Sequence, residues 1–280
     1  MQVRPAAVAG TWYPGSRGAL TREVDAYVEA VPELAPFDVQ AIIAPHAGIM
    51  FSGPVAAYAY KAAAAAAPYD VIVLVGPSHF SAFEGVAVFP GGSFETPLGL
   101  SRIDAASVEV LAARSGISTL TAPHAREHSL EMQLPFVCRL LPGVPIVPML
   151  MGFQRRETIL ELAGSLAVAF AGRRALLVAS TDLSHYFDAA TAASLDRRVQ
   201  ERVAALDPEG LLELIEGYPE DERGRFVACG AGPAVAVMMA ARRLGATEGR
   251  VLEYAHSGQI SGDNAAVVGY LAAALGKPAS

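Results

Sequence analysis

The sequence has few cysteines: its 280 residues include only Cys138 and Cys229. The two lie far apart in the sequence and have no CxxC spacing, and a structural disulfide is not expected in a reducing compartment. Apolar runs are short, and none reaches the roughly 18 residues that cross a bilayer. The N-terminal stretch MQVRPAAVAGTWYPGS also lacks the charged and apolar segments of a signal peptide. We therefore expect a cytoplasmic protein without a membrane partner.

Positive charge is also in deficit. The chain carries 21 lysines and arginines against 28 aspartates and glutamates, which gives a net charge of −7. A field of this sign repels polyanions, so we expect no nucleic-acid partner. The glycine fingerprints of Walker and Rossmann nucleotide sites are absent, and no segment repeats at a solenoid period. Hydrophobic residues make up 52% of the chain, which is enough for a large core.

Apolar, strand-like runs alternate with helix-like segments along the chain. Strands are expected at 39–46, 71–79, 85–90, 144–152, 175–185 and 264–275, the last continuing either as strand or as helix. Helices are expected at 53–67, 104–116, 155–172, 192–206 and 232–245. This alternation predicts an α/β sandwich in which helices cover both faces of a central sheet. Because no Ser/Gly linker or long charge run divides the chain, we expect one domain over residues 1–280.

Three of the six histidines follow apolar strands directly. His46 ends AIIAPH, His79 ends VLVGPSH and His185 ends LLVASTDLSH. Ligands of open α/β sheets bind outside the carboxyl ends of the strands, so these imidazoles could converge on one cleft. Any one of them taken alone reads better as a loop histidine bonded to backbone. Three with the same placement favour a site, and Ser78, beside His79, would border it.

Cys229 lies between a short apolar run and a predicted helix, in FVACGAGPAVAV. Pro233 suits the first turn of that helix, so the thiol would lie near a helix N-terminus, where thiolate is favoured. Thiolate is a good ligand for zinc, iron or copper. The alternative is a small buried hydrophobic residue, which is how we interpret Cys138.

The segment STDLSHYFD places Asp182 three residues before His185, on a turn after a strand. This spacing allows a carboxylate to orient an imidazole as a general base. In YAHSGQISGDNAAVVGY, Asp263 lies in a Gly/Ser-rich loop that either lines a site or forms a turn before the last strand.

HAREHSLEMQLPF is a second polar cluster, and we interpret it as the start of a helix. Helical spacing would place Glu127 with Glu131, and His124 with His128, on common faces. The zincin signature HExxH is absent, so that mechanism lacks its glutamate. We expect His128 and Glu131 to face the substrate or to support the ligands.

These segments together resemble the Memo family, the B component of the AmmeMemoRadiSam system, from about Arg4 to about Ala273. The resemblance rests on eight ordered motifs: RPAAVAGTWYPG, APHAGIMFSGPVAAYAY, VGPSHF, FETPLG, EHSLEMQLPF, STDLSHYFD, CGAGP and SGQISGDNAAVVGYLA. It implies a fold like that of the class III extradiol (LigB-type) non-haem iron dioxygenases, a single α/β domain with a central, largely parallel or mixed sheet.

The resemblance also implies a ligand set. His46 and His79 match the two histidine ligands of the dioxygenases, and Cys229 takes the position of their glutamate. His185 matches their acid/base histidine, with Asp182 nearby. The implied metal is Fe(II), with Cu or Zn as alternatives, since two imidazoles and a thiolate can hold any of these ions.

Three functions remain open from the sequence. The first is a metal-dependent, dioxygenase-like redox enzyme acting on a small molecule, for which the system name implies radical SAM and AMMECR-type protein partners. The second is a binding or regulatory module that takes a peptide or small ligand in the same cleft, because fold does not fix activity. The third is a thiol hydrolase with Cys229 as nucleophile and His185 or His79 as base.

Overall fold

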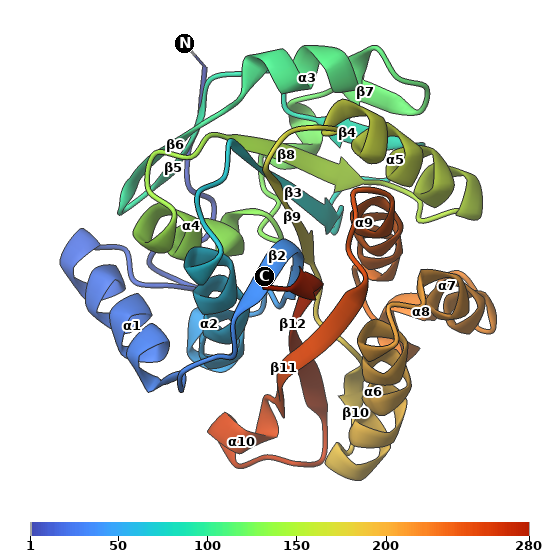
Figure 1. Ribbon diagram of the computed structural model, residues 1–280. Helices are drawn as coiled ribbons and strands as arrows, with labels where there is room; N and C mark the ends of the chain where they lie inside the picture. The colour runs from blue at the N-terminus through green and yellow to red at the C-terminus, as the bar shows by residue number, and fades with distance from the viewer. Residues whose placement is uncertain (1, 280) are drawn as a thin grey trace.

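The centre of the molecule is a large mixed sheet (Figure 1). The structure, a computed structural model, describes residues 2–279. Within these residues the main sheet has nine strands, in the order β10-β12-β2-β9-β3-β8-β4-β7 with β11 paired to β12. A separate sheet has the order β1-β5-β6. Met1 and Ser280, the ends of the domain predicted over 1–280, lie outside the described residues.

Four parallel strands form the middle of the main sheet: β2 (Phe37–Ala44), β9 (Ala175–Ser180), β3 (Val71–Pro77) and β8 (Ile146–Met151). Nearly all of their residues are buried, as expected for strands covered on both faces. The other strands are β12 (Val267–Pro278), β11 (Glu248–His256), β10 (His185–Phe187), β4 (Val86–Val88), β7 (Ile117–Thr119), β1 (Val3–Arg4), β5 (Ser93–Thr96) and β6 (Gly99–Arg102).

Helices cover both faces of this sheet (Figure 1). On one face α2 (Ile49–Ala65) packs on β2 and β12, with α1 (Arg17–Ala30) and α4 (Leu134–Leu140) against it. On the other face α9 (Ala231–Arg243) packs on β9 and β3, and α5 (Arg156–Ala169) and α7 (Pro208–Glu216) flank it. The remaining helices are α3 (Ala105–Ala112), α6 (Ala189–Ala204), the short α8 (Arg223–Phe226) and α10 (Gly258–Ser261), and two 3-10 turns, η1 (Ala122–His124) and η2 (Glu131–Gln133).

The predicted α/β sandwich with a mixed sheet is confirmed. The strand predicted at 175–185 is in fact two elements, because the chain leaves β9 after Ser180 and crosses to β12, where Leu183 donates to the Gly269 carbonyl at 2.8 Å. The segment 264–275 continues as strand and not as helix. None of the helices in residues 2–279 combines the length and apolar character of a membrane span.

Candidate metal centre

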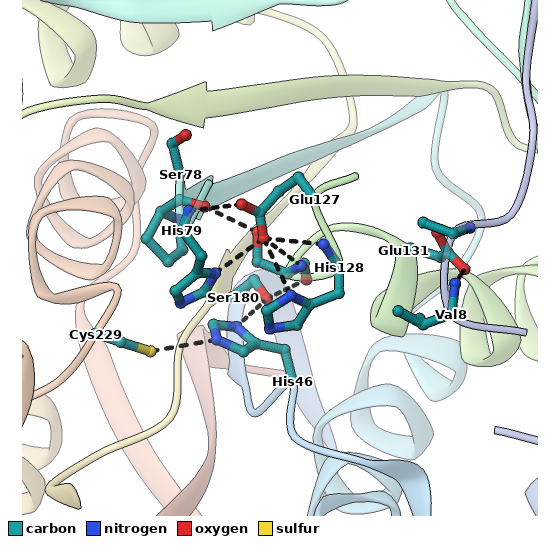
Figure 2. A network of polar contacts seen from close by, with 12 residues as sticks. Val8, His46, Ser78, His79, Glu127, His128, Glu131, Ser180 and Cys229 are labelled. Carbon is teal, nitrogen blue, oxygen red and sulfur yellow. Dashed lines mark hydrogen bonds and ion pairs between the residues drawn. The ribbon is translucent and has the colours of Figure 1, made fainter. Parts of the chain in front are cut away.

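The carboxyl ends of two parallel strands and the start of a helix bring two histidines and one cysteine together (Figure 2). His46 follows β2 and His79 follows β3, and β9 lies between these two strands. Cys229 immediately precedes the turn into α9, which packs on β9. One donor atom from each of the three residues lies within 4.8 Å of the other two. Residues far apart in the sequence thus meet at the carboxyl ends of the central strands, where the strand-end pattern predicts a cleft.

The hydrogen bonds around His46 fix its tautomer. His46 is 2% exposed, and its Nδ1 lies 2.9 Å from the Ser180 hydroxyl oxygen. That hydroxyl already donates its proton to the Ser129 carbonyl, at 2.6 Å, so His46 Nδ1 must be the donor and Nε2 carries a lone pair. Nε2 faces Cys229 Sγ at 3.2 Å. Burial, together with the positive potential of neighbouring imidazoles, lowers the pKa of His46 and keeps the ring neutral.

His79 is anchored in a similar way by a buried carboxylate. Glu127 accepts from His79 Nδ1 at 2.9 Å and from the His79 backbone N–H at 2.6 Å. The bond to Nδ1 leaves Nε2 to face Cys229. Burial opposes a charge on His79, but its hydrogen bonds to Cys229 and Glu127 outweigh burial and raise its pKa to about 10. A metal ion at Nε2 would displace that proton.

Glu127 is saturated as an acceptor. Besides His79, its carboxylate accepts the backbone N–H groups of His128 and Ser129, both at 2.9 Å. Burial would raise the pKa of Glu127, yet these bonds hold it down at about 2, so the group is ionised. Although Glu127 also clusters with His79 and His128, its bonds direct it to orienting His79, which leaves Cys229 as the candidate third ligand.

Hydrogen bonds to Asp182 and Gln154 hold Cys229 in place. Its backbone N–H donates to the Asp182 carbonyl at 3.2 Å, and its carbonyl accepts from Gln154 Nε2 at 2.7 Å. Sγ in turn accepts from the Asp182 backbone N–H at 3.3 Å. The next residue, Gly230, lies so close to β9 that a Cβ there would be 2.4 Å from the Ser180 carbonyl oxygen. Only glycine allows this approach.

The donor set fits a transition-metal ion. Two imidazoles with anchored Nδ1 atoms and one thiol suit iron, copper or zinc. A tetrahedral ion with ordinary metal–nitrogen and metal–sulfur bonds separates two such ligands by about 3.5 Å, and the Sγ–Nε2 distance of 3.2 Å is close to that value.

A cavity of about 530 Å³ opens onto the three donors. Its walls combine imidazoles, aromatic rings and one arginine: Trp12, His46, Ala47, Gly48, His79, His128, Asp182, His185, Tyr186, Gly224, Arg225, Cys229 and Val268. The His128 ring stacks on His79 with centroids 4.6 Å apart, and Trp12 lies 4.3 Å from His128. A small molecule in this cavity would contact the candidate ligands directly.

Comparison with known proteins decides the family. A family model described as Memo-like protein matches residues 4–274. The chain belongs to the Memo family. A MEMO1 family protein of Methanothermobacter thermautotrophicus is 37% identical, over 96% of this chain and 98% of its own length. Another, from Methanopyrus kandleri, is 37% identical over 96% of this chain and 97% of its own.

The fold also has a solved counterpart. The crystal structure of an uncharacterized protein from Escherichia coli K12 matches with a TM-score of 0.53 and 14% sequence identity. The match covers 83% of this Memo-family chain and 99% of the other. At this identity the likeness shows a shared fold alone.

In this Memo-family chain Asp182 does not bond to His185, contrary to the prediction from their spacing. The Asp182 carboxylate instead accepts the backbone N–H groups of His46 and Ala47, at 2.7 and 3.3 Å. His185 is placed by its pairing with Val268 as the first residue of β10. Both side chains line the cavity, but within residues 2–279 the His185 Nδ1 has no hydrogen-bond partner.

The helix predicted through His124–Glu131 is wrong. Residues between η1 and η2 form a loop, because the Glu127 carboxylate takes the His128 and Ser129 N–H groups that a helix would pair with carbonyls. As a result the predicted common faces do not form. His128 does line the cavity. His124 is buried away from it, with Nε2 3.2 Å from the Ala87 carbonyl.

Three other predicted site residues lie outside the cavity wall. Glu131 is fully buried and accepts from Ala7 N, Val8 N and the Tyr13 hydroxyl, at 2.8, 3.0 and 2.6 Å. The Ser78 hydroxyl donates to the Ser81 carbonyl at 2.7 Å and points away from the imidazoles (Figure 2). Asp263 is exposed and accepts from Ala265 N at 2.9 Å, as in the turn alternative. These contacts hold the three side chains to neighbouring protein groups outside the cavity.

Sequence reasoning missed three contributors. Ser180 anchors His46, and its only sequence signal is its position as the last residue of a buried strand. Glu127 orients His79, whereas its spacing in the sequence indicates only a place on a helix face. Trp12 reaches the cavity from the N-terminal segment, far from every strand end, and no local pattern indicates this.

Proposed function

We propose that this chain binds one metal ion, Fe(II) in the first place and Cu or Zn as alternatives, through His46 Nε2, His79 Nε2 and Cys229 Sγ. The observation that carries the proposal is the pair of Nδ1 anchors. Ser180 and Glu127 each occupy the Nδ1 side of one ring, so both Nε2 atoms face the sulfur. Metal-binding histidines are typically oriented in this way.

We further propose a redox activity of the dioxygenase-like kind on a small molecule. Iron held by three protein ligands would supply one-electron chemistry and open coordination positions. His185 would transfer the proton, because its ring lines the same cavity and, within the described chain, its Nδ1 is not tied to another group. Asp182 would have a positioning role, because its carboxylate accepts the backbone N–H groups of His46 and Ala47 and so holds the turn after β2 in place.

Radical SAM and AMMECR-type proteins are the proposed partners. The support for them is family membership alone. The cavity of about 530 Å³ has room for a small molecule or a few residues of a peptide.

Metal analysis of anaerobically purified protein tests the metal site. We expect about one ion per chain in the unaltered protein and in the matched controls Cys138→Ser and His256→Ala, whose side chains lie outside the cavity wall. Cys229→Ser, His46→Ala and His79→Ala should lose most of the metal. Oxygen consumption by the iron-loaded protein then tests the activity.

Two results would overturn the proposal. One is protein that holds no stoichiometric iron, copper or zinc after reloading. The other is an unchanged metal content in His46→Ala. Ligand binding by metal-free protein that survives Cys229→Ser would favour the binding or regulatory module.

A further inference from the structure

One arginine lines the cavity of the candidate metal centre. Arg225 lies in the short α8, four positions before Cys229, and it shares the cavity wall with His185 and Tyr186. Tyr186 has a positive φ of 62°, a conformation that non-glycine residues rarely adopt. Such local strain is concentrated at functional sites.

Aromatic rings support the Arg225 side chain. Its guanidinium carbon lies 4.8 Å from the centroid of Phe187 and 5.6 Å from that of Phe226. The two rings contact each other, with centroids 4.9 Å apart, and Tyr218 stacks on Phe226. Cation–π contacts of this kind position a guanidinium without using its N–H donors.

Those donors have no acceptor in the described chain. Within residues 2–279 the Arg225 guanidinium makes no hydrogen bond or ion pair, whereas Arg223, two residues earlier, donates to the Tyr218 carbonyl. Arg225 is exposed, like several other arginines without a partner, but it alone among the arginines of residues 2–279 lines this cavity. The one carboxylate in its wall, Asp182, is 4% exposed and already accepts two backbone N–H groups.

We propose that Arg225 is an anion-binding residue that recognises a carboxylate or phosphate group on the small molecule taken into this cavity. The inference rests on the proposed function and specifies its substrate class. Guanidinium binds both oxyanions in a bidentate, charge-assisted manner. Because the whole chain carries a net charge of −7, a local positive group would favour the entry of an anionic ligand. With the anion at Arg225, the rest of the molecule would occupy the cavity whose wall also includes Trp12 and the three metal-site donors.

Trp12 makes the proposal directly measurable. It is the only tryptophan of the chain, and it lines the same cavity. We would titrate zinc-loaded protein, which is redox-inert, with benzoate, phenyl phosphate and the neutral benzamide, and follow Trp12 fluorescence and ligand-observed NMR. We expect saturable binding of at least one anion and about tenfold weaker binding of benzamide. The two anions distinguish carboxylate from phosphate recognition.

Variants separate Arg225 from the metal as the anion receptor. Arg225→Met should weaken anion binding about tenfold, and Arg225→Lys should recover part of it. The matched control is Arg126→Met, because Arg126 also lies over an exposed ring, Phe80, at 5.3 Å but outside the cavity wall. This control should bind anions like the unaltered protein.

The proposal is overturned if neither anion binds saturably, if benzamide binds as well as the anions, or if Arg225→Met keeps full anion affinity. The metal content of each variant is measured in parallel. If the protein retains its metal and Arg225→Met leaves anion binding unchanged, only this inference is refuted. Absence of metal in the unaltered protein refutes the proposed function, and the same titration is then run on metal-free protein.

Discussion

At the residue scale, each candidate histidine ligand depends on one neighbouring oxygen. Ser180 accepts from His46 Nδ1 and Glu127 accepts from His79 Nδ1, both at 2.9 Å. The two anchors are not equivalent. The Ser180 hydroxyl is neutral, whereas the Glu127 carboxylate is ionised and makes its imidazole more basic. His79 is therefore the more electron-rich of the two candidate nitrogen ligands.

Glu127→Gln tests the role of the carboxylate. Glutamine keeps the shape, but its amide nitrogen cannot accept the N–H groups that Glu127 accepts through both oxygens. We expect metal affinity to fall about 10- to 100-fold, measured by competition with a chelator. The exposed Glu84→Gln is the control and should keep full affinity. A glutamine variant that binds metal as tightly as the unaltered protein would contradict the assigned role.

At the element scale, the strand ends explain why the sequence predicts so much of the centre. His46 and His79 follow β2 and β3, and the apolar runs locate the bounds of these strands to within two residues. Parallel strands place their carboxyl ends on the same side of the sheet. Helix α1 and strand β11 were not predicted. Strand β11 is mostly half-buried and lacks a continuous apolar run. Its position follows from pairing with β12, which local sequence does not encode.

The loop around Glu127 could not be predicted for a similar reason. Its spacing fits a helix, but a tertiary contact decides otherwise: the carboxylate must reach the His79 backbone, 48 positions away in the sequence. The same limit applies to Asp182, where sequence proximity suggested His185 as partner and the fold supplies the His46 N–H. Local spacing identifies which groups carry chemistry but not which of them meet.

The close packing of the Cys229 turn on β9 gives a second prediction. Gly230→Ala would place a Cβ 2.4 Å from the Ser180 carbonyl oxygen, so the turn must move and carry the Cys229 thiol with it. We expect a folded protein with at least tenfold weaker metal binding, measured by chelator competition and circular dichroism. Gly164→Ala, in α5, is the matched control because its nearest neighbour atom is 3.5 Å away. Unaltered affinity in Gly230→Ala would show that the turn tolerates displacement.

The N-terminal segment gives a third prediction. Glu131 is fully buried, pairs with the buried Arg4 and binds two backbone N–H groups of that segment. Glu131→Gln would leave Arg4 without a counter-charge, so we expect the free energy of unfolding to fall by about 3 kcal/mol in urea denaturation. The exposed pair of Glu209 and Arg242 is the comparison, and Glu209→Gln should cost less than about 1 kcal/mol. Equal losses in both variants would contradict this account.

At the scale of the whole molecule, buried imidazoles make stability depend on acid pH. Burial lowers the pKa of His124 to about 4, against about 6.5 in an unfolded chain. Between these values the unfolded chain takes up a proton that the folded chain does not, so stability is lost as the pH falls. From pH 7 to pH 5 this residue accounts for a loss of about 2 kcal/mol in the free energy of unfolding.

His124→Gln isolates that contribution. We would measure the free energy of unfolding by urea denaturation at pH 7 and at pH 5. Between these values it should fall by about 2 kcal/mol less in the variant than in the unaltered protein. His128, whose pKa burial also lowers to about 4, is intact in both proteins and cancels in the comparison. An identical pH dependence in the two proteins would show that His124 is not held neutral.

The strand order also sets a sequence of events during synthesis. Strand β2, which leads to His46, pairs on one side with β9 and on the other with β12, whose residues 267–278 are made more than two hundred positions later. When the ribosome has completed β2, neither neighbour exists. The segment that carries His46 therefore reaches its native position only after β12 has been made, and the proposed metal ion could be captured in the native geometry only from then on. Loading of the proposed ion would therefore follow the synthesis of β12.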